Sequence, residues 1–184
     1  MRWKSIYLTC TLLAVGMNQP VLASACGEGS PTYNWVDSIE SQDWARMQEL
    51  LTPDATYDDP TVVHLGQNAI ALVGREAIIE FFRDSSEELD ARNIDYEITQ
   101  CFESGGITVL TMTFSIATSG AYWNINTELI DLTGIGTTVI THRPEGIAAV
   151  VDYVDYAGIQ TQIERFRLQY GEAKDSDSNP EDHQ

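Results

Sequence analysis

The sequence predicts an α+β fold in which helices come first and a meander of antiparallel strands follows. Apolar residues recur at helical spacing in several segments before residue 90. From Ile94 onwards the period changes to two, and Gly105-Gly106 and Ser119-Gly120 mark turns between successive strands. We expect one curved antiparallel sheet with the helices packed on its concave side. A strongly bent sheet facing helices encloses a cone, and the mouth of such a cone is a typical small-molecule site.

We expect four helices. The first begins at residues 30–34, and the other three cover residues 44–51, 74–89 and 158–170. In the first, Trp35, Val36 and Ile39 recur at helical spacing. Asp43 has the place of a cap for the second helix, and Thr52-Pro53-Asp54 ends it. These assignments put the helices mainly in the first half of the domain, with one helix closing the chain.

The expected strands alternate polar and apolar side chains. They cover residues 55–58, a segment around 94–98, a segment around 109–114 and residues 147–156. Between the last two we expect strands at 122–132 and 136–143, or one long strand with a bulge near Gly134 and Gly136. Residues 61–73 are mostly apolar without a clear period, which predicts a loop.

Residues 1–25 have the features of a cleaved secretory signal peptide. Arg2 and Lys4 form a basic start, a mostly apolar run covers residues 6–17, and Ala23-Ser24-Ala25 matches the small-x-small cleavage pattern. The apolar run is too short to span a bilayer comfortably. We therefore expect a secreted or periplasmic protein. The alternative is a lipoprotein anchored at Cys26, although Ala23 stands where such proteins carry a large aliphatic residue.

The rest of the chain has the length of one domain. We assign residues 26–170 to this domain and the acidic residues 171–184 to a disordered tail. The chain carries 10 basic and 28 acidic residues, a net charge of −18. Loss of Arg2 and Lys4 with the signal peptide leaves 8 against 28, or −20. Such a charge disfavours nucleic acid and anionic membranes as partners.

Cys26 and Cys101 remain after cleavage, an even pair in an oxidising compartment. A disulfide would tie the start of the domain to a strand. Two unpaired thiols are the alternative, because the sequence does not give the distance between them.

Two segments carry a resemblance to a known family. Residues 43–60 (DWARMQELLTPDATYDDP) and 74–82 (GREAIIEFF) resemble the NTF2-like superfamily, and its SnoaL-like branch most. The ending at residues 147–156 is similar to the last strand of that branch, and the likeness covers residues 32–168. The resemblance implies a cone-shaped α+β barrel. It leaves the activity open, since this fold hosts isomerases, hydrolases, cyclases, dehydratases and non-catalytic binders.

Three enzyme types with this fold match only in part. Ketosteroid isomerases use an Asp before a Pro as base, which fits Asp59, but Trp35 and Thr138 stand where their oxyanion donors belong. Limonene-type epoxide hydrolases share Tyr57 and Asp152, but Asp59 replaces their Asn. Their Arg and second Asp are missing near Thr113 and Ser115. Polyketide cyclases use a late-strand acid as base, for which Asp152 is the candidate.

We expect a pocket in which Asp59, Asp152 and Tyr57 are the catalytic residues. Two acids in one apolar cavity cannot both ionise cheaply, so one pKa should rise and give an acid–base pair near neutral pH. The expected ligand-binding residues are Trp35, His64, Phe82, Met112, Phe114, Trp123 and Val150.

Each candidate has a structural alternative. Asp59 before a proline is typical of a turn cap, and Asp152 could pair with Arg143 or a backbone donor. His142 could face outward, and Tyr153 and Tyr156 are interpreted as packing or interface residues.

No metal site is expected, because the three histidines have no i, i+4 pairing with acids. The sequence has no Gly-rich phosphate loop, nucleophile elbow or CxxC, so we expect no cofactor. The main hypothesis is a cofactor-independent isomerase, cyclase or epoxide-hydrolase-like enzyme acting on a small hydrophobic molecule. The alternative is a secreted binder of a hydrophobic ligand. A homodimer through the sheet is compatible with both.

Overall fold

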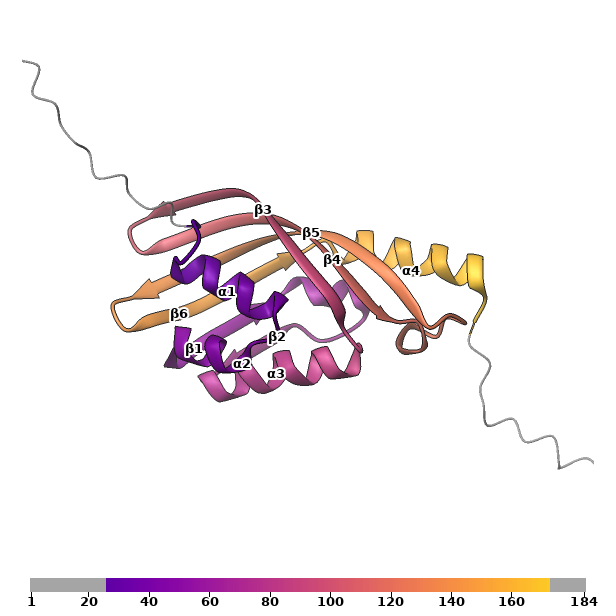
Figure 1. Ribbon diagram of the computed structural model, residues 1–184, viewed down its shortest axis with the longest axis horizontal. Coiled ribbons are helices and arrows are strands. Elements are labelled where there is room, and N and C mark those ends of the chain that lie inside the picture. Colours follow the sequence, from indigo (N-terminus) through magenta and orange to yellow (C-terminus); the bar gives the residue numbers. More distant parts are fainter. Residues whose placement is uncertain (1–25, 173–184) are drawn as a thin grey trace, which may run out of the picture.

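The computed structural model describes residues 26–172, and the predicted signal peptide and most of the predicted tail lie outside that range. Its centre is a curved, open six-stranded sheet with helices on one face (Figure 1). The strands are β1 (Leu51–Asp59), β2 (Ile70–Val73), β3 (Arg92–Ser104), β4 (Ile107–Ser119), β5 (Leu129–Arg143) and β6 (Gly146–Val154). The helices are α1 (Pro31–Glu40), α2 (Trp44–Leu50), α3 (Arg75–Glu88) and α4 (Tyr156–Tyr170), with short 3₁₀ turns η1 (Thr61–Leu65) and η2 (Ala121–Trp123). The predicted α+β class is confirmed.

The strand order is β2-β1-β6-β5-β4-β3. Strands β3 to β6 follow one another as the predicted antiparallel meander. The expectation of a wholly antiparallel sheet is wrong at one place, because β6 pairs with β1 in parallel. The last strand of the meander returns beside the first strand of the chain, and its direction is already fixed by β5. This return brings Tyr57 of β1 opposite Val150 of β6.

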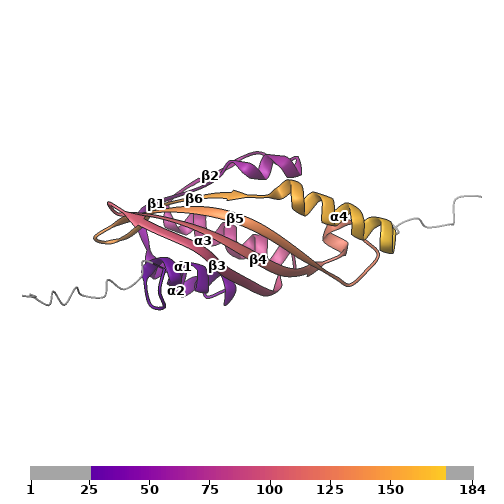
Figure 2. The same ribbon diagram turned by 90° about the horizontal axis from the view of Figure 1, so that it is seen from above.

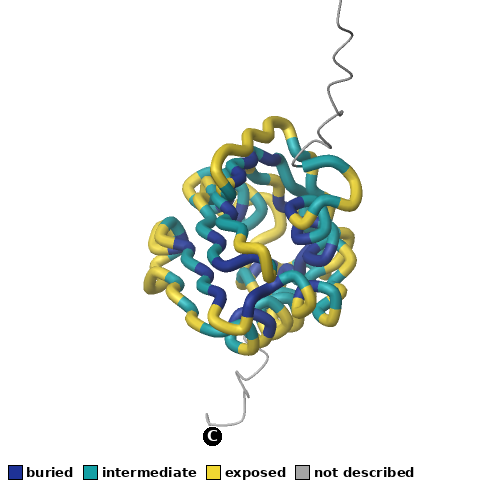
Figure 3. The backbone as a smooth tube through the Cα atoms, turned by 90° about the vertical axis from the view of Figure 1, so that its left-hand side faces the viewer, coloured by how far each residue is buried: buried dark blue, intermediate teal, exposed yellow. Residues whose placement is uncertain are grey.

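Helices α1 and α2 begin where the sequence predicts. The Ser30 side chain accepts a hydrogen bond from the Tyr33 amide, and the Asp43 side chain accepts one from the Arg46 amide. Figure 2 shows both helices on one side of the strands β3 to β6, with α4 at the opposite end of the sheet. The main core lies between these layers and includes Trp35, Met47 and Ile78. Figure 3 shows buried segments gathered inside the molecule and most exposed segments on its periphery.

Two other segments differ from the expectation. Residues 61–73 are not a featureless loop, because they contain η1 and the short edge strand β2. Residues 122–132 are not a separate strand, because η2 turns the chain and a single β5 follows. The register between β4 and β5 is unbroken from Ile107 to Ser119, so no bulge lies at Gly134. A Cβ at Gly134 would clash with the ring of Phe114, which crosses the backbone there.

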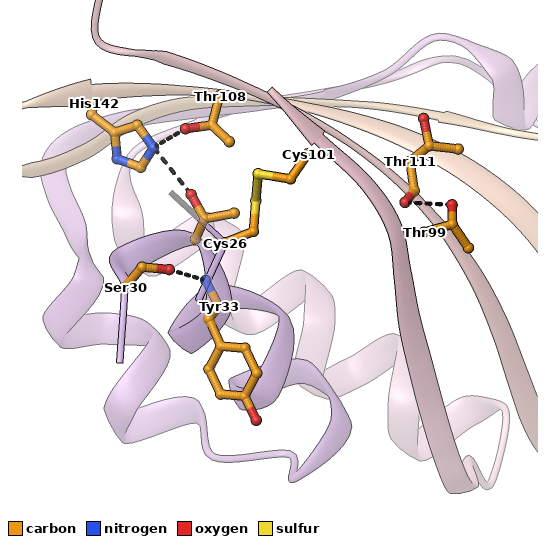
Figure 4. Close-up of a disulfide and its surroundings, with 9 residues drawn as sticks. Cys26, Ser30, Tyr33, Thr99, Cys101, Thr108, Thr111 and His142 are labelled. Carbon is orange, nitrogen blue, oxygen red and sulfur yellow. Dashed lines mark hydrogen bonds between the residues drawn. A yellow bond between two sulfur atoms is a disulfide. The ribbon is translucent and has the colours of Figure 1, made fainter. Parts of the chain in front are cut away.

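Cys26 and Cys101 form a disulfide with a Cα–Cα distance of 6.2 Å (Figure 4). The bond ties the segment before α1 to β3. Beside it, His142 Nε2 lies 3.3 Å from the hydroxyl of Thr32 and 3.1 Å from that of Thr108. His142 therefore points toward α1 rather than outward. Among the described helices, none is long and apolar enough to cross a membrane.

Candidate active site

A cavity of about 720 Å³ lies between the concave face of the sheet and the helices. Every helix and every strand contributes at least one residue to its lining. Its walls are strongly aromatic: Trp35, Trp44, Tyr57, Phe81, Phe82, Tyr96, Phe114, Tyr122, Trp123 and Tyr156. Several of these rings contact one another, with centroids 5.0 Å apart for Tyr57 and Phe82 and 5.6 Å for Trp35 and Phe82. The cavity is therefore an apolar, largely preformed space of the size that small-molecule ligands occupy.

Asp152 lies in the middle of β6 and lines this cavity. The alternation of side chains along a strand puts it on the same face as Val150 and Val154. Its Oδ2 accepts a hydrogen bond of 2.9 Å from the Tyr57 hydroxyl, and its Oδ1 accepts one of 2.5 Å from the Thr138 hydroxyl. Tyr57 and Asp152, which we expected in one pocket, are thus in direct contact. Arg143, the alternative partner, instead pairs with Asp54 at 2.9 Å.

Burial raises the pKa of Asp152 from 3.8 to about 6. The hydroxyl groups of Thr138 and Tyr57 oppose this rise because they stabilise the carboxylate, whereas the nearby charge of Asp59 adds to it. The pKa of the Tyr57 phenol is raised well above its usual value, mainly by burial and then by the charge of Asp152. Tyr57 therefore stays protonated and donates, while Asp152 can exchange a proton near neutral pH.

Asp59 ends β1 and is 1% exposed. Its Oδ1 accepts hydrogen bonds from the Thr61 amide (2.9 Å), the Thr61 hydroxyl (2.7 Å) and the Val62 amide (3.1 Å). Its Oδ2 accepts one of 2.6 Å from the Tyr156 hydroxyl. Asp59 thus has the turn-capping contacts of the structural alternative and also lines the cavity. Asp59 can cap the turn and line the cavity together, because Oδ1 contacts residues 61 and 62 of the turn and Oδ2 contacts the cavity residue Tyr156.

The cavity brings the two aspartates together. The last register pair between β1 and β6 is Asp58 with Val151, and an aspartate follows on each strand. Thr61 links Asp59 to β6, since its hydroxyl donates to Asp59 Oδ1 and accepts a hydrogen bond of 2.9 Å from the Val154 amide. The arrangement is one fixed carboxyl group beside one whose proton is exchangeable.

Five of the seven expected ligand-binding residues line the cavity: Trp35, Phe82, Met112, Phe114 and Trp123. His64 does not, and its side chain is exposed on η1. Val150 does not either, because it is fully buried in the core beneath the cavity floor.

Three cavity tyrosines, Tyr96, Tyr122 and Tyr156, were missed by sequence reasoning. Tyr156, interpreted as a packing or interface residue, donates to Asp59, and its pKa is raised by burial and by that hydrogen bond. Tyr96 lines the cavity from β3, and burial raises its pKa. The alternation of polar and apolar residues around Tyr96 could have predicted that its side chain lies on the cavity side of the sheet. Tyr156 had no such pattern, because it lies just past the last strand, where the alternation ends.

Within residues 26–172, no group of three or more His, Cys, Asp or Glu side chains is placed to hold a metal ion. The indole Nε1 of Trp123 is buried and has no hydrogen-bond partner among the described residues. It is therefore a free donor in a side chain that lines the cavity.

Comparison with known proteins gives one family and many similar structures. The SnoaL-like domain profile matches residues 33–156. One similar structure is a protein from Shewanella denitrificans that is described provisionally as a SnoaL-like polyketide cyclase. It is 19% identical to this chain with a TM-score of 0.64, and the match covers 73% of this chain and 95% of the other. A hypothetical protein with a ketosteroid isomerase-like fold from Catenulispora acidiphila, in complex with trimethylamine, is 17% identical with a TM-score of 0.60, covering 74% and 93%.

An LEH-like epoxide hydrolase from M. tuberculosis is 12% identical with a TM-score of 0.57, covering 75% of this chain and 90% of the other. These similar structures share the NTF2-like fold, and at such identities the likeness concerns the fold alone. A search of curated proteins finds no match.

Proposed function

Because this chain belongs to the SnoaL-like family, we propose that it is a cofactor-independent enzyme that moves a proton on a small hydrophobic substrate. The observation that carries this proposal is the half-buried Asp152, held by two hydroxyl groups in an aromatic cavity, with its pKa raised to about 6. A group with this pKa can accept and return a proton within one reaction cycle near neutral pH. Isomerisation, cyclisation and epoxide hydrolysis all need such a step.

The other polar groups have supporting roles in this proposal. Tyr57 and Thr138 orient the Asp152 carboxyl group through their hydroxyls. Asp59 is held by four hydrogen bonds and sets the electrostatic environment of Asp152.

A non-catalytic binder of a hydrophobic ligand is the second candidate function. One observation favours it: all four carboxylate oxygens of Asp59 and Asp152 accept a hydrogen bond from the protein itself. A role in maintaining the fold is sufficient to explain carboxylates whose oxygens are satisfied in this way. The two functions differ in whether Asp152 changes its protonation state during the cycle.

We also propose export through residues 1–25, with a lipid anchor at Cys26 as the alternative. The Cys26–Cys101 disulfide supports a destination outside the cytosol, where such bonds persist. A homodimer through the sheet is supported by large exposed side chains on its outer face, among them Phe102 (67% exposed), Ile135 (56%) and Tyr153 (48%).

The test is a screen of the protein without residues 1–25 against steroids, terpenoid epoxides and aromatic polyketides. Thermal shift reports binding, and product analysis reports turnover. The matched variants are Asp152→Asn and Asp59→Asn, which remove the same charge at the two sites. We expect a ligand class that wild type converts, that the Asp59 variant still converts and that the Asp152 variant binds without conversion. Binding to all three proteins with no conversion by wild type would establish the binder instead.

A further inference from the structure

The charged side chains around the cavity are all of one sign. Five carboxylates line it: Asp59, Glu80, Asp84, Glu88 and Asp152. Among the described residues, no Lys, Arg or His belongs to the lining. An anionic ligand would therefore enter a space that repels it and find no side chain to pair with. The charges of the lining residues therefore disfavour anionic ligands and favour neutral or cationic ones.

Six of the seven arginines in residues 26–172 have partners other than Asp152, and the seventh, Arg165, is exposed and outside the cavity lining. Arg46 pairs with Asp37, Arg143 with Asp54 and Arg92 with Asp90. Arg75 pairs with Glu76 and Arg83 with Asp84, while the guanidinium of Arg167 donates to the carbonyl oxygen of Trp123. Asp152 is left with two neutral hydroxyl donors as its only hydrogen-bond partners in residues 26–172. A buried carboxylate without a counter-charge is costly, so a positive group next to it would be strongly stabilising.

The walls suit a cation of low hydration. Trp35, Trp44 and Trp123 are three of the ten aromatic residues in the lining, and indole faces bind cations best. Tyr57 and Phe82 add a second group of rings around the Asp152 end of the cavity. Aromatic rings are the side chains that bind quaternary and tertiary ammonium groups, which combine positive charge with an apolar surface.

Carboxylates also mark the rim. Glu80, Asp84 and Glu88 recur every four residues along α3, so they share one side of that helix, and all three are exposed. Asp84 has Arg83 as a neighbour at 3.6 Å in an exposed pair. With a net charge of −18 on the whole chain, this side of the opening attracts cations and repels anions.

We propose that the cavity binds a hydrophobic amine in its cationic form, an aromatic or aliphatic body carrying a tertiary or quaternary ammonium group that pairs with Asp152. This inference names a ligand class for the cavity to which we assign the enzymatic function, and it rests on that assignment only for the identity of the site. A neutral ligand of equal shape fills the same space but leaves Asp152 without a counter-charge. The charge on nitrogen is therefore what the site selects.

The test compares two molecules that differ in one atom. Benzoylcholine carries a trimethylammonium group, and 3,3-dimethylbutyl benzoate has the same shape with a neutral carbon in place of the nitrogen. Calorimetry at neutral pH would measure the affinity of each molecule for wild type, for Asp152→Asn and for Glu97→Gln. Glu97 is an exposed residue outside this cavity, so its variant controls for the loss of one charge. The Asp152 variant must bind the neutral molecule as wild type does, which shows that its cavity is intact.

We expect wild type and Glu97→Gln to prefer the cation by about tenfold or more, and Asp152→Asn to lose most of that preference. Equal affinity for the two molecules, failure of wild type to bind either, or a preference that survives in Asp152→Asn would each overturn the proposal. If Asp152→Asn does not fold, the wild-type comparison alone decides. Cation selectivity without turnover of any amine would contradict the enzymatic function and leave this inference standing. Turnover of neutral substrates without cation selectivity would support the enzymatic function and overturn this inference.

Discussion

The two aspartates of the cavity come from neighbouring strands but lie in different surroundings. Asp59 ends β1, where it accepts four hydrogen bonds, two of them from backbone amides. Asp152 lies inside β6, where it accepts two hydrogen bonds from side-chain hydroxyls. Backbone amides hold a carboxylate in place as part of the fold, whereas a carboxyl group held by hydroxyls keeps the freedom to gain and lose a proton. In the function that we propose, Asp59 maintains the fold and Asp152 transfers the proton.

The largest expected effect is on turnover. Asp152→Asn should lower kcat on the substrate class found by screening by about 10³-fold, since it removes the carboxyl group to which we assign the proton transfer. Steady-state kinetics would measure this, with Asp131→Asn, an exposed residue of β5, as the charge-matched control. Equal losses in the Asp152 and Asp59 variants would erase the contrast between the two regions.

The pH dependence of stability should separate the regions next. The pKa of Asp152 is about 6 in the folded state against 3.8 as reference, so the folded state binds more protons between these values. Its stabilising contribution is present below about pH 4 and is lost as pH rises through 6, a change of about 3 kcal/mol. Urea unfolding of wild type and Asp152→Asn from pH 4 to 7 would measure the difference. Parallel curves would mean that Asp152 titrates normally.

A smaller effect should follow from removing the fixed carboxylate. Asp59→Ala leaves the amides of Thr61 and Val62 and the hydroxyl of Tyr156 without their acceptor. We expect the free energy of unfolding to fall by about 2 kcal/mol, the usual cost of such buried donors. Denaturant unfolding at pH 7 measures this. An unchanged midpoint would show that η1 does not depend on Asp59.

The smallest effect should come from the Tyr156 hydroxyl. Tyr156→Phe keeps the ring and removes one hydrogen bond to Asp59, so the free energy of unfolding should fall by about 1 kcal/mol. Tyr153→Phe is the control, because Tyr153 is 48% exposed. Equal behaviour of the two variants in thermal unfolding would show that the second oxygen of Asp59 contributes nothing.

Local patterns were sufficient for most of the fold. The caps at Ser30 and Asp43, and the face shared by Val150, Asp152 and Val154, follow from rules that act within a few residues. The parallel return of β6 to β1 depends on contacts across nearly a hundred residues, which no local pattern encodes.

The same limit applies to the site. Asp152 could be predicted because a charged residue interrupts an apolar strand. Its hydroxyl partner Thr138 and the contact between Tyr156 and Asp59 could not, because they depend on which strands and helices become neighbours. His64 lies outside the cavity lining, and the helical turn of η1 that carries it could not be recognised in a segment without a period.

The disulfide has a consequence for the edge of the sheet. Strand β3 has a neighbour on one side only, so its other side presents free backbone groups that another chain could pair with. The Cys26–Cys101 bond holds the segment before α1 across this strand, and the Glu40 side chain accepts a hydrogen bond of 2.7 Å from the Tyr96 amide. By chain entropy, a link across 75 residues contributes about 4 kcal/mol. Loss of this bond would therefore remove one of the two links that hold the N-terminal segment and α1 beside the free edge of β3.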